Sequence, residues 1–212
     1  MPSAGTAVGA RALFKILFWV CGMKKISIYL AGNVRKINTK DEDDSWREEF
    51  KRDLKEKLDG IDVKFLDPTM RLEHIKDSYS IFAQDVFFVA NCDFVLVEGK
   101  NKVGIGVGVE MLTAKMHGIP VISIVPKGSY YRSMDQYSAK RLSVELKKNW
   151  VHPFMLSLSD IIVEDLGEAA KWIKEHGKEK KKIKNHSVIN EAIEYYKKTH
   201  YHNDEQAKDA FE

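Results

Sequence analysis

The sequence predicts an α/β protein in which a parallel β-sheet is covered by helices on both faces. Short, nearly continuous apolar runs alternate along the chain with amphipathic stretches. Strands that are apolar along their whole length are typical of parallel sheets, because helices cover both faces of such sheets. The chain has 212 residues, which favours one domain with a sizeable core.

The first strand and the first helix are indicated by two different patterns. Residues 26–30 form an apolar run of strand length. The stretch from Ser45 to Glu48 has the capping-box pattern that opens a helix, and this helix is expected to end near Leu58. Its apolar face consists of Trp46, Phe50 and Leu54.

The second and third strands follow with one helix between them. Residues 62–66 are the second strand, which Asp67 and Pro68 end. A helix is expected over about residues 80–90, and the third strand over residues 93–97.

The last elements begin with a glycine-rich turn. That turn leads into a helix expected over about residues 109–117 and then into a fourth strand, residues 121–125. A weaker fifth strand at residues 160–163 precedes a helix over residues 166–176. A final amphipathic helix, residues 185–201, could pack back on the domain or contact another subunit.

Five such strands suggest a flavodoxin-like (Rossmann-like) sheet with strand order 2-1-3-4-5. In such a sheet the ligand crevice lies where the loops after the first and third strands diverge. This rule brings the segment "YLAGNVRK" close to the glycine-rich turn. The functional site is therefore expected at that crevice.

The chain divides into three parts by composition. Residues 1–22 are interpreted as a peripheral extension, residues 23–177 as the domain, and residues 178–212 as a basic linker with the last helix. The apolar stretch "RALFKILFWV" could suggest a signal peptide, but Lys15 interrupts it and no small-residue cleavage site follows. It is also too short to span a membrane.

Charge and cysteine content limit the possible partners. The net charge is only +3, so a nucleic acid polymer is not an expected partner, and the basic run beginning at Lys178 is interpreted as a solvated linker. The only cysteines, Cys21 and Cys92, argue against a disulfide framework and for a cytoplasmic protein. His74, His117 and His152 lack metal-ligand spacing, so neither a metal nor a cofactor is expected.

The glycine-rich turn contains Gly104, Gly106 and Gly108, directly before a glutamate, Glu110. A dinucleotide fingerprint spaces its glycines differently and follows the first strand. These glycines are instead expected to let a ligand approach the backbone closely. A glutamate in the first turn of a helix is common for structural reasons, because the helix dipole favours it there. Its place at the predicted crevice also makes it a candidate nucleophile.

Other side chains at the crevice would suit glycosidic chemistry. Asp85, in the helix before the third strand, supplies a second carboxylate, and two carboxylates flanking a sugar can break a glycosidic bond. Tyr29, near the end of the first strand, could orient the nucleophile by hydrogen bonding. The loop from Gly32 to Arg35 could receive a hydroxyl group or a phosphate.

Three ordered segments resemble one enzyme family. "IYLAGNVRK", "AQDVFFVANCDFVLVE" and "GIGVGVEMLTAKMHGIPVI" look like the nucleoside 2-deoxyribosyltransferases and their relatives, the 2′-deoxynucleoside 5′-phosphate N-hydrolases. The resemblance covers about residues 25–126. It implies a flavodoxin-like fold and homodimers or larger homo-oligomers, in which a neighbouring subunit completes each pocket.

The resemblance also implies roles for individual residues. It makes Glu110 the nucleophile that attacks C1′ of the sugar, Asp85 the residue that handles the base or its protonation, and Tyr29 the support of the nucleophile. The implied substrate-binding residues are Gly32, Asn33, Arg35, Gly104, Gly106, Gly108 and Ser133, the last of these acting in a neighbour's phosphate site. Gly104 departs from the family, because transferases have an aspartate there and phosphate-preferring hydrolases tend to have a serine.

The sequence thus predicts an enzyme that cleaves the N-glycosidic bond of a nucleoside or its 5′-monophosphate through a glycosyl-glutamate intermediate. Transfer to water gives hydrolysis, and transfer to a second base gives exchange. The alternative is a non-catalytic nucleotide-binding module of the same fold, which Gly104 favours.

Overall fold

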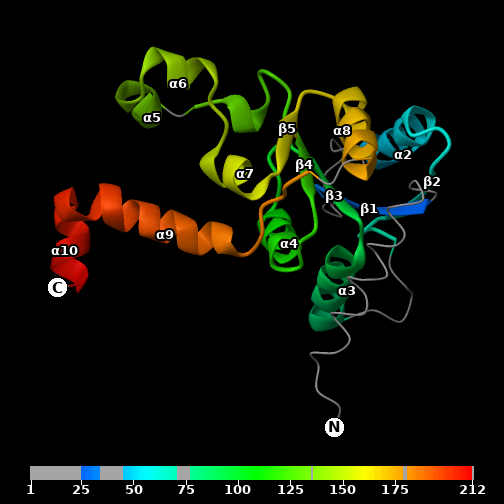
Figure 1. Ribbon diagram of the computed structural model, residues 1–212, viewed down its shortest axis with the longest axis horizontal. Helices are drawn as coiled ribbons and strands as arrows, with labels where there is room; N and C mark the ends of the chain where they lie inside the picture. The colour runs from blue at the N-terminus through cyan, green and yellow to red at the C-terminus, as the bar shows by residue number, and fades with distance from the viewer. Residues whose placement is uncertain (1–24, 34–44, 71–76, 135, 179–180, 212) are drawn as a thin grey trace, which may run out of the picture.

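The computed structural model describes residues 25–33, 45–70, 77–134, 136–178 and 181–211. At its centre is a five-stranded, all-parallel sheet with strand order β2-β1-β3-β4-β5 (Figure 1). The strands are β1 (Lys25–Ala31), β2 (Asp62–Leu66), β3 (Phe94–Glu98), β4 (Val121–Ile124) and β5 (Ile161–Val163). The predicted fold class and strand order are confirmed, and each strand ends within one residue of its expected limit.

Two layers of helices cover the sheet, as expected. On one face, α2 (Ser45–Lys57) packs against α8 (Leu166–Lys178). On the other face, α3 (Ser78–Asn91) packs against α4 (Ile105–Met116), which in turn contacts α7 (Pro153–Leu158). Alternate residues of each strand point to opposite faces, so the sheet separates two hydrophobic clusters.

The start of α4 differs from the sequence-based expectation. The glycine-rich segment was expected to be a turn before a helix near residue 109, but the helix begins at Ile105 with Gly104 as its N-cap residue. Val107 and Met111 are buried against the sheet, and their burial stabilises a helix that Gly106 and Gly108 disfavour. Gly106 and Gly108 are therefore helical residues.

The amino end of β4 is fixed by a buried ion pair. Lys115 of α4 binds the carboxylate of Asp160 through Nζ, and both side chains are almost completely buried. The same carboxylate accepts hydrogen bonds from the backbone N–H groups of Val121 and Lys184, at 2.7 and 2.6 Å. One aspartate thus joins α4, β4 and the C-terminal segment.

The C-terminal segment extends away from the sheet. Figure 1 shows α9 (Ser187–Thr199) and α10 (Glu205–Phe211), in orange and red, projecting from the domain beyond α7. Val188 packs against one core cluster, whereas Ile189 and Ile193 on the same apolar stripe are more than 40% exposed (44% and 47%). Only the beginning of the stripe therefore packs back on the domain.

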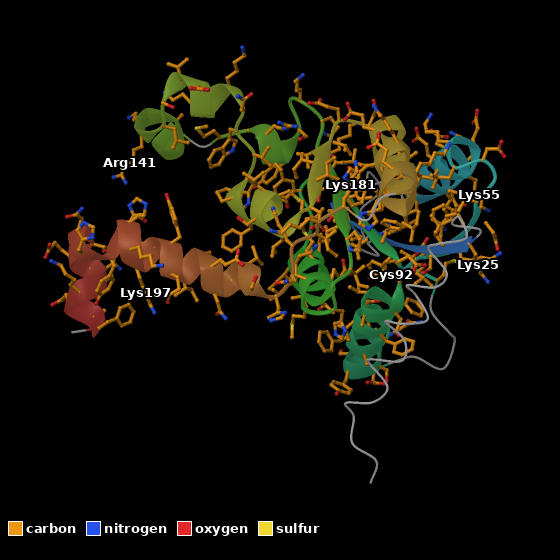
Figure 2. All side chains as sticks on the ribbon, viewed as in Figure 1. Lys25, Lys55, Cys92, Arg141, Lys181 and Lys197 are labelled. Atoms are coloured by element: carbon orange, nitrogen blue, oxygen red, sulfur yellow. The ribbon has the colours of Figure 1, made fainter. Side chains whose placement is uncertain are left out.

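The remaining helical elements lie in two places. Between β4 and α7 are a 3₁₀ turn, η1 (Tyr130–Arg132), and the helices α5 (Gln136–Arg141) and α6 (Val144–Lys148). A second 3₁₀ turn, η2 (Tyr201–Asn203), lies between α9 and α10. Figure 2 shows Arg141 of α5 and Lys197 of α9 on two separate projections of the molecule. Cys92 is buried where α3 meets the sheet, and its thiol donates to the carbonyl of Val89, which fits a structural cysteine (Figure 2).

No helix among the described residues is long and apolar enough to cross a membrane. The apolar stretch within residues 11–20, and the extension of which it is part, lie outside the described residues.

Candidate functional site

The centre of the candidate site is a hydrogen bond between Tyr29 and Glu110. Tyr29 Oη donates to Glu110 Oε1 at 2.7 Å, and the two residues are 0% and 9% exposed. They come from β1 and α4, which are 81 positions apart in the sequence. The structure therefore brings together the expected nucleophile and its expected support.

The local structure explains why the two side chains meet. Tyr29 and Ala31 point to the face of the sheet that α3 and α4 cover, because side chains alternate along β1. On α4, Glu110 lies between Val107 and Met111 on the buried side of the helix. A carboxylate so placed must find a polar partner, and the tyrosine hydroxyl provides one.

The helix-dipole explanation of Glu110 is weakened by the structure. Because α4 begins at Ile105, Glu110 lies in the second turn of the helix, and no acidic residue occupies the first turn. The effect of the dipole on a side chain falls off beyond the first turn. Contact with Tyr29 is thus a better account of its position than electrostatic capping.

Asp85 lies near the middle of α3 and is partly buried. Since α3 packs beside α4, both carboxylates belong to the helical layer on the same face of the sheet. Asp77 is the N-cap residue of α3 and accepts a hydrogen bond from the N–H of Ser80 at 2.8 Å, so the helix begins at Ser78, two residues before its expected start. The assignment of Asp85 to base protonation stays a prediction.

Gly32 and Asn33, which directly follow β1, lie close to α2 and to the loop after β3. A Cβ atom added to Gly32 would lie 2.6 Å from the ring of Trp46 and 3.2 Å from Cβ of Glu98, so only glycine fits there. The side-chain amide of Asn33 donates to the carbonyl of Lys102 at 2.5 Å, which ties this loop to the loop after β3. Arg35, the expected phosphate ligand, lies outside the described residues.

The three glycines at the start of α4, of which Gly104 is the N-cap residue, do not share one environment. A Cβ atom added to any of them would meet no atom within 4 Å, so packing inside the chain does not require glycine. Gly106 precedes Glu110 by four residues and shares its face of the helix. Gly104 and Gly108 instead line an apolar groove of about 440 Å³ between α4 and α7.

That groove is a different surface from the Tyr29–Glu110 pair. Its other lining residues are mostly apolar and come from α4, η1, α7 and the start of α9, for example Ile105, Tyr131, Phe154 and Ile189. Glu110 and Tyr29 do not line it. Of the three glycines, only Gly106 therefore lies on the side of the helix that carries Glu110, and the expected role of the glycines in letting a ligand approach the backbone stays a prediction.

Ser133 follows η1 and is exposed. Its hydroxyl donates to the carbonyls of Tyr130 and Ser129 at 2.9 and 3.2 Å, within its own turn. The turn is attached to the loop after β3, because Tyr131 Oη accepts a hydrogen bond from the N–H of Val103 at 3.1 Å. Whether Ser133 serves a neighbouring subunit stays a prediction.

Buried charges near the first loop were missed by the sequence reasoning. Arg47 is 1% exposed, Asp67 is 6% exposed and Glu98 is 5% exposed. Burial raises the pKa of Glu98, although hydrogen bonds from the backbone of Lys100 and Asn101 oppose this effect. Asp67 directly follows β2 and Glu98 ends β3. An acidic residue at the carboxyl end of a buried strand was the feature of the sequence that could have indicated these buried charges.

No group of three or more metal-ligating side chains lies close together among the described residues. Of the histidines considered from the sequence, His117 is exposed and His152 packs between the rings of Tyr131 and Phe154. His74 lies outside the described residues.

Comparison with known proteins supports the fold. No protein-family model matches the chain, and no curated protein matches its sequence. A conserved protein from Enterococcus faecalis V583 is similar in structure, with a TM-score of 0.53 and 17% identity over 73% of this chain and 99% of that protein. The CMP N-glycosidase BcmB from Clostridium botulinum aligns with a TM-score of 0.38 and 14% identity, over 71% of this chain and 98% of that protein. At these identities, the likeness to the Enterococcus protein establishes a shared fold, and the activity has to be argued from the site.

Proposed function

We propose that this protein cleaves the N-glycosidic bond of a nucleoside, or of its 5′-monophosphate, through a covalent glycosyl-Glu110 intermediate. The observation that carries the proposal is the buried hydrogen bond between Tyr29 Oη and Glu110 Oε1. A glutamate whose only task was to cap a helix would lie in the first turn and face water. Glu110 is instead turned inward and held by a tyrosine from β1, an inner strand of the sheet.

In the first step, the carboxylate of Glu110 attacks C1′ of the sugar. The bond between C1′ and the base nitrogen breaks, and its electron pair stays with the base, which receives a proton. We assign delivery of that proton to Asp85, on the neighbouring helix of the same layer. Tyr29 keeps the carboxylate in one orientation, which favours in-line attack.

In the second step, an acceptor attacks C1′ and Glu110 leaves as a carboxylate. Water as the acceptor returns a proton to Asp85 and completes hydrolysis, whereas a second base gives exchange. Two displacements at the same carbon retain the configuration of the sugar. The first loop, which includes Gly32 and Asn33, would bind the 5′ side of the substrate through backbone N–H groups.

The test is a panel of nucleosides and 5′-monophosphates, with and without an acceptor base, read by chromatography. We expect release of free base by the wild-type protein and loss of release in Glu110→Gln, which keeps the size of the side chain. Glu49→Gln is the matched control, because Glu49 is an exposed glutamate on α2.

The panel also distinguishes the branches of the proposal. Release from 5′-monophosphates alone indicates a hydrolase, and base exchange indicates a transferase. Binding without release by the wild-type protein would contradict the proposal and favour a non-catalytic nucleotide-binding module. Equal release by wild-type and Glu110→Gln proteins would exclude Glu110 as the nucleophile.

A further inference from the structure

We infer that Arg47 is a positioning residue that fixes Gly32 and Asn33, the first two residues of the loop after β1, in the conformation needed to receive the substrate. This inference rests on the proposed function, because it assigns the loop to the 5′ side of a nucleoside or nucleotide. Arg47 belongs to α2, on the opposite face of the sheet from Glu110, and its side chain is buried beneath the loop.

The guanidinium group of Arg47 holds two consecutive carbonyl groups. Its Nη1 donates to the carbonyl of Asn33 at 2.8 Å, and its Nη2 donates to the carbonyl of Gly32 at 3.2 Å. In a trans peptide the N–H group points away from the carbonyl of the preceding residue. The N–H of Asn33 therefore points away from Arg47, and it can donate to an anionic or hydroxyl group of a ligand.

Arg47 is itself fixed by several contacts. Its Nε lies 3.4 Å from Asp67 Oδ1, and its guanidinium group lies 4.3 Å from the centre of the Trp46 ring. Asp67 also binds Lys51 at 2.7 Å and accepts a hydrogen bond from the N–H of Thr69 at 2.9 Å. Burial alone would raise the pKa of Asp67, but these bonds outweigh it and hold the pKa below its ordinary value.

Lysine could not replace Arg47 in this arrangement. A guanidinium group presents its N–H donors in a rigid, planar fork, and this fork spans two carbonyl groups and one carboxylate together. An ammonium group is a compact charge on a flexible chain. Arg47→Lys therefore keeps the positive charge beside Asp67 while weakening control over the loop.

Asn33 is also hydrogen-bonded to the segment that leads into α4, the helix that carries Glu110. Asn33 Nδ2 donates to the carbonyl of Lys102, and Ile105 begins α4 three residues later. The same guanidinium group thus supports a loop that is joined to the segment leading to Glu110. Loss of this support is expected to affect substrate binding more than the chemical step.

The experiment compares Arg47→Lys with Lys51→Met. Lys51 lies one helical turn further along α2 and binds Asp67 and Glu48. Its replacement therefore removes a contact of Asp67, the carboxylate that also pairs with Arg47, but leaves the hydrogen bonds from Arg47 to Gly32 and Asn33 in place. Two quantities are measured for each variant: amide hydrogen exchange of residues 31–33 in the free protein, and KM and kcat on a substrate found in the panel.

We expect Arg47→Lys to speed exchange at these amides and to raise KM about tenfold, with kcat changed by less than about threefold. Lys51→Met is expected to lower the thermal midpoint but to leave loop exchange and KM close to wild type. The inference is overturned if both variants give the same KM, or if loop exchange in Arg47→Lys is unchanged. Absence of any turnover by the wild-type protein would contradict the proposed function instead, and the exchange comparison would still decide whether Arg47 holds the loop.

Discussion

Tyr29→Phe isolates the hydrogen bond on which the proposed site depends. The substitution removes one oxygen and keeps the aromatic ring, so it opens no large cavity in the core. The lost bond joins Tyr29 Oη to Glu110 Oε1 at 2.7 Å, a length typical of a hydrogen bond to a carboxylate. A buried hydrogen bond to a charged group contributes about 1.5–3 kcal/mol, so the free energy of unfolding should fall by about that amount.

The same free energy predicts the effect on catalysis. If the bond is kept in the transition state to orient the carboxylate, its loss should lower kcat by about 10- to 100-fold. The assay is urea denaturation of Tyr29→Phe, Glu110→Gln and the double variant, together with kcat of Tyr29→Phe. A double-mutant cycle then gives the coupling between the two side chains.

One combination of results would contradict the proposed coupling between Tyr29 and Glu110. A coupling free energy below about 0.5 kcal/mol, together with a wild-type kcat for Tyr29→Phe, would show that the tyrosine neither stabilises nor orients the glutamate.

Three further predictions concern buried groups outside this pair. Asp160→Asn leaves Lys115 buried without its counter-charge and should lower the free energy of unfolding by about 3–5 kcal/mol in urea denaturation. Because burial lowers the pKa of Lys115, the lysine loses its charge more easily as the pH rises, and the loss of stability should become smaller. A loss that does not change with pH would contradict this account. The raised pKa of Glu98 means that its contribution to stability is present below its ordinary value of 4.5 and is lost as the pH rises through the higher folded value. Glu98→Gln should therefore melt at a higher temperature than wild type at pH 7, and this advantage should vanish at about pH 4; identical melting curves at both pH values would argue against it. Gly108→Ala should raise the free energy of unfolding by about 0.5–1 kcal/mol in urea denaturation, because alanine favours the helix and no atom occupies the space that its Cβ would take. A destabilised variant would show that folding of the chain requires glycine at this position.

The sheet could be predicted well because its signal is local. Each strand is a short run of apolar residues, and β3 and β4 are buried at every position. Strand order followed from the general rules for parallel sheets and not from any particular contact. Those rules also placed Tyr29 and Glu110 in one region, where a hydrogen bond from the tyrosine to the glutamate was expected, and the structure contains that bond.

The start of α4 could not be predicted in the same way. Glycines at positions 104, 106 and 108 give this segment a low helix propensity, so the sequence favoured a turn. The structure forms a helix there because Val107 and Met111 are buried against the sheet. Tertiary packing, which a local pattern does not contain, decided the outcome.

The buried charges were missed for a related reason. Arg47 and Lys115 occur in amphipathic helices, where a basic residue is usually exposed to solvent. Their partners, Asp67 and Asp160, lie 20 and 45 positions further along the chain. Only the folded chain shows that these pairs are buried together, and the support of the first loop by Arg47 followed from that observation.

The most direct test of the proposed function is a search for the covalent intermediate. The protein is mixed with a substrate from the panel, denatured by acid within the first turnovers, digested and analysed by mass spectrometry. We predict a glycosyl adduct on the peptide that contains Glu110 in the wild-type protein, and no adduct in Glu110→Gln. Free base released at the wild-type rate with no adduct at any time, or with an adduct on another residue, would contradict the assignment of Glu110 as the nucleophile.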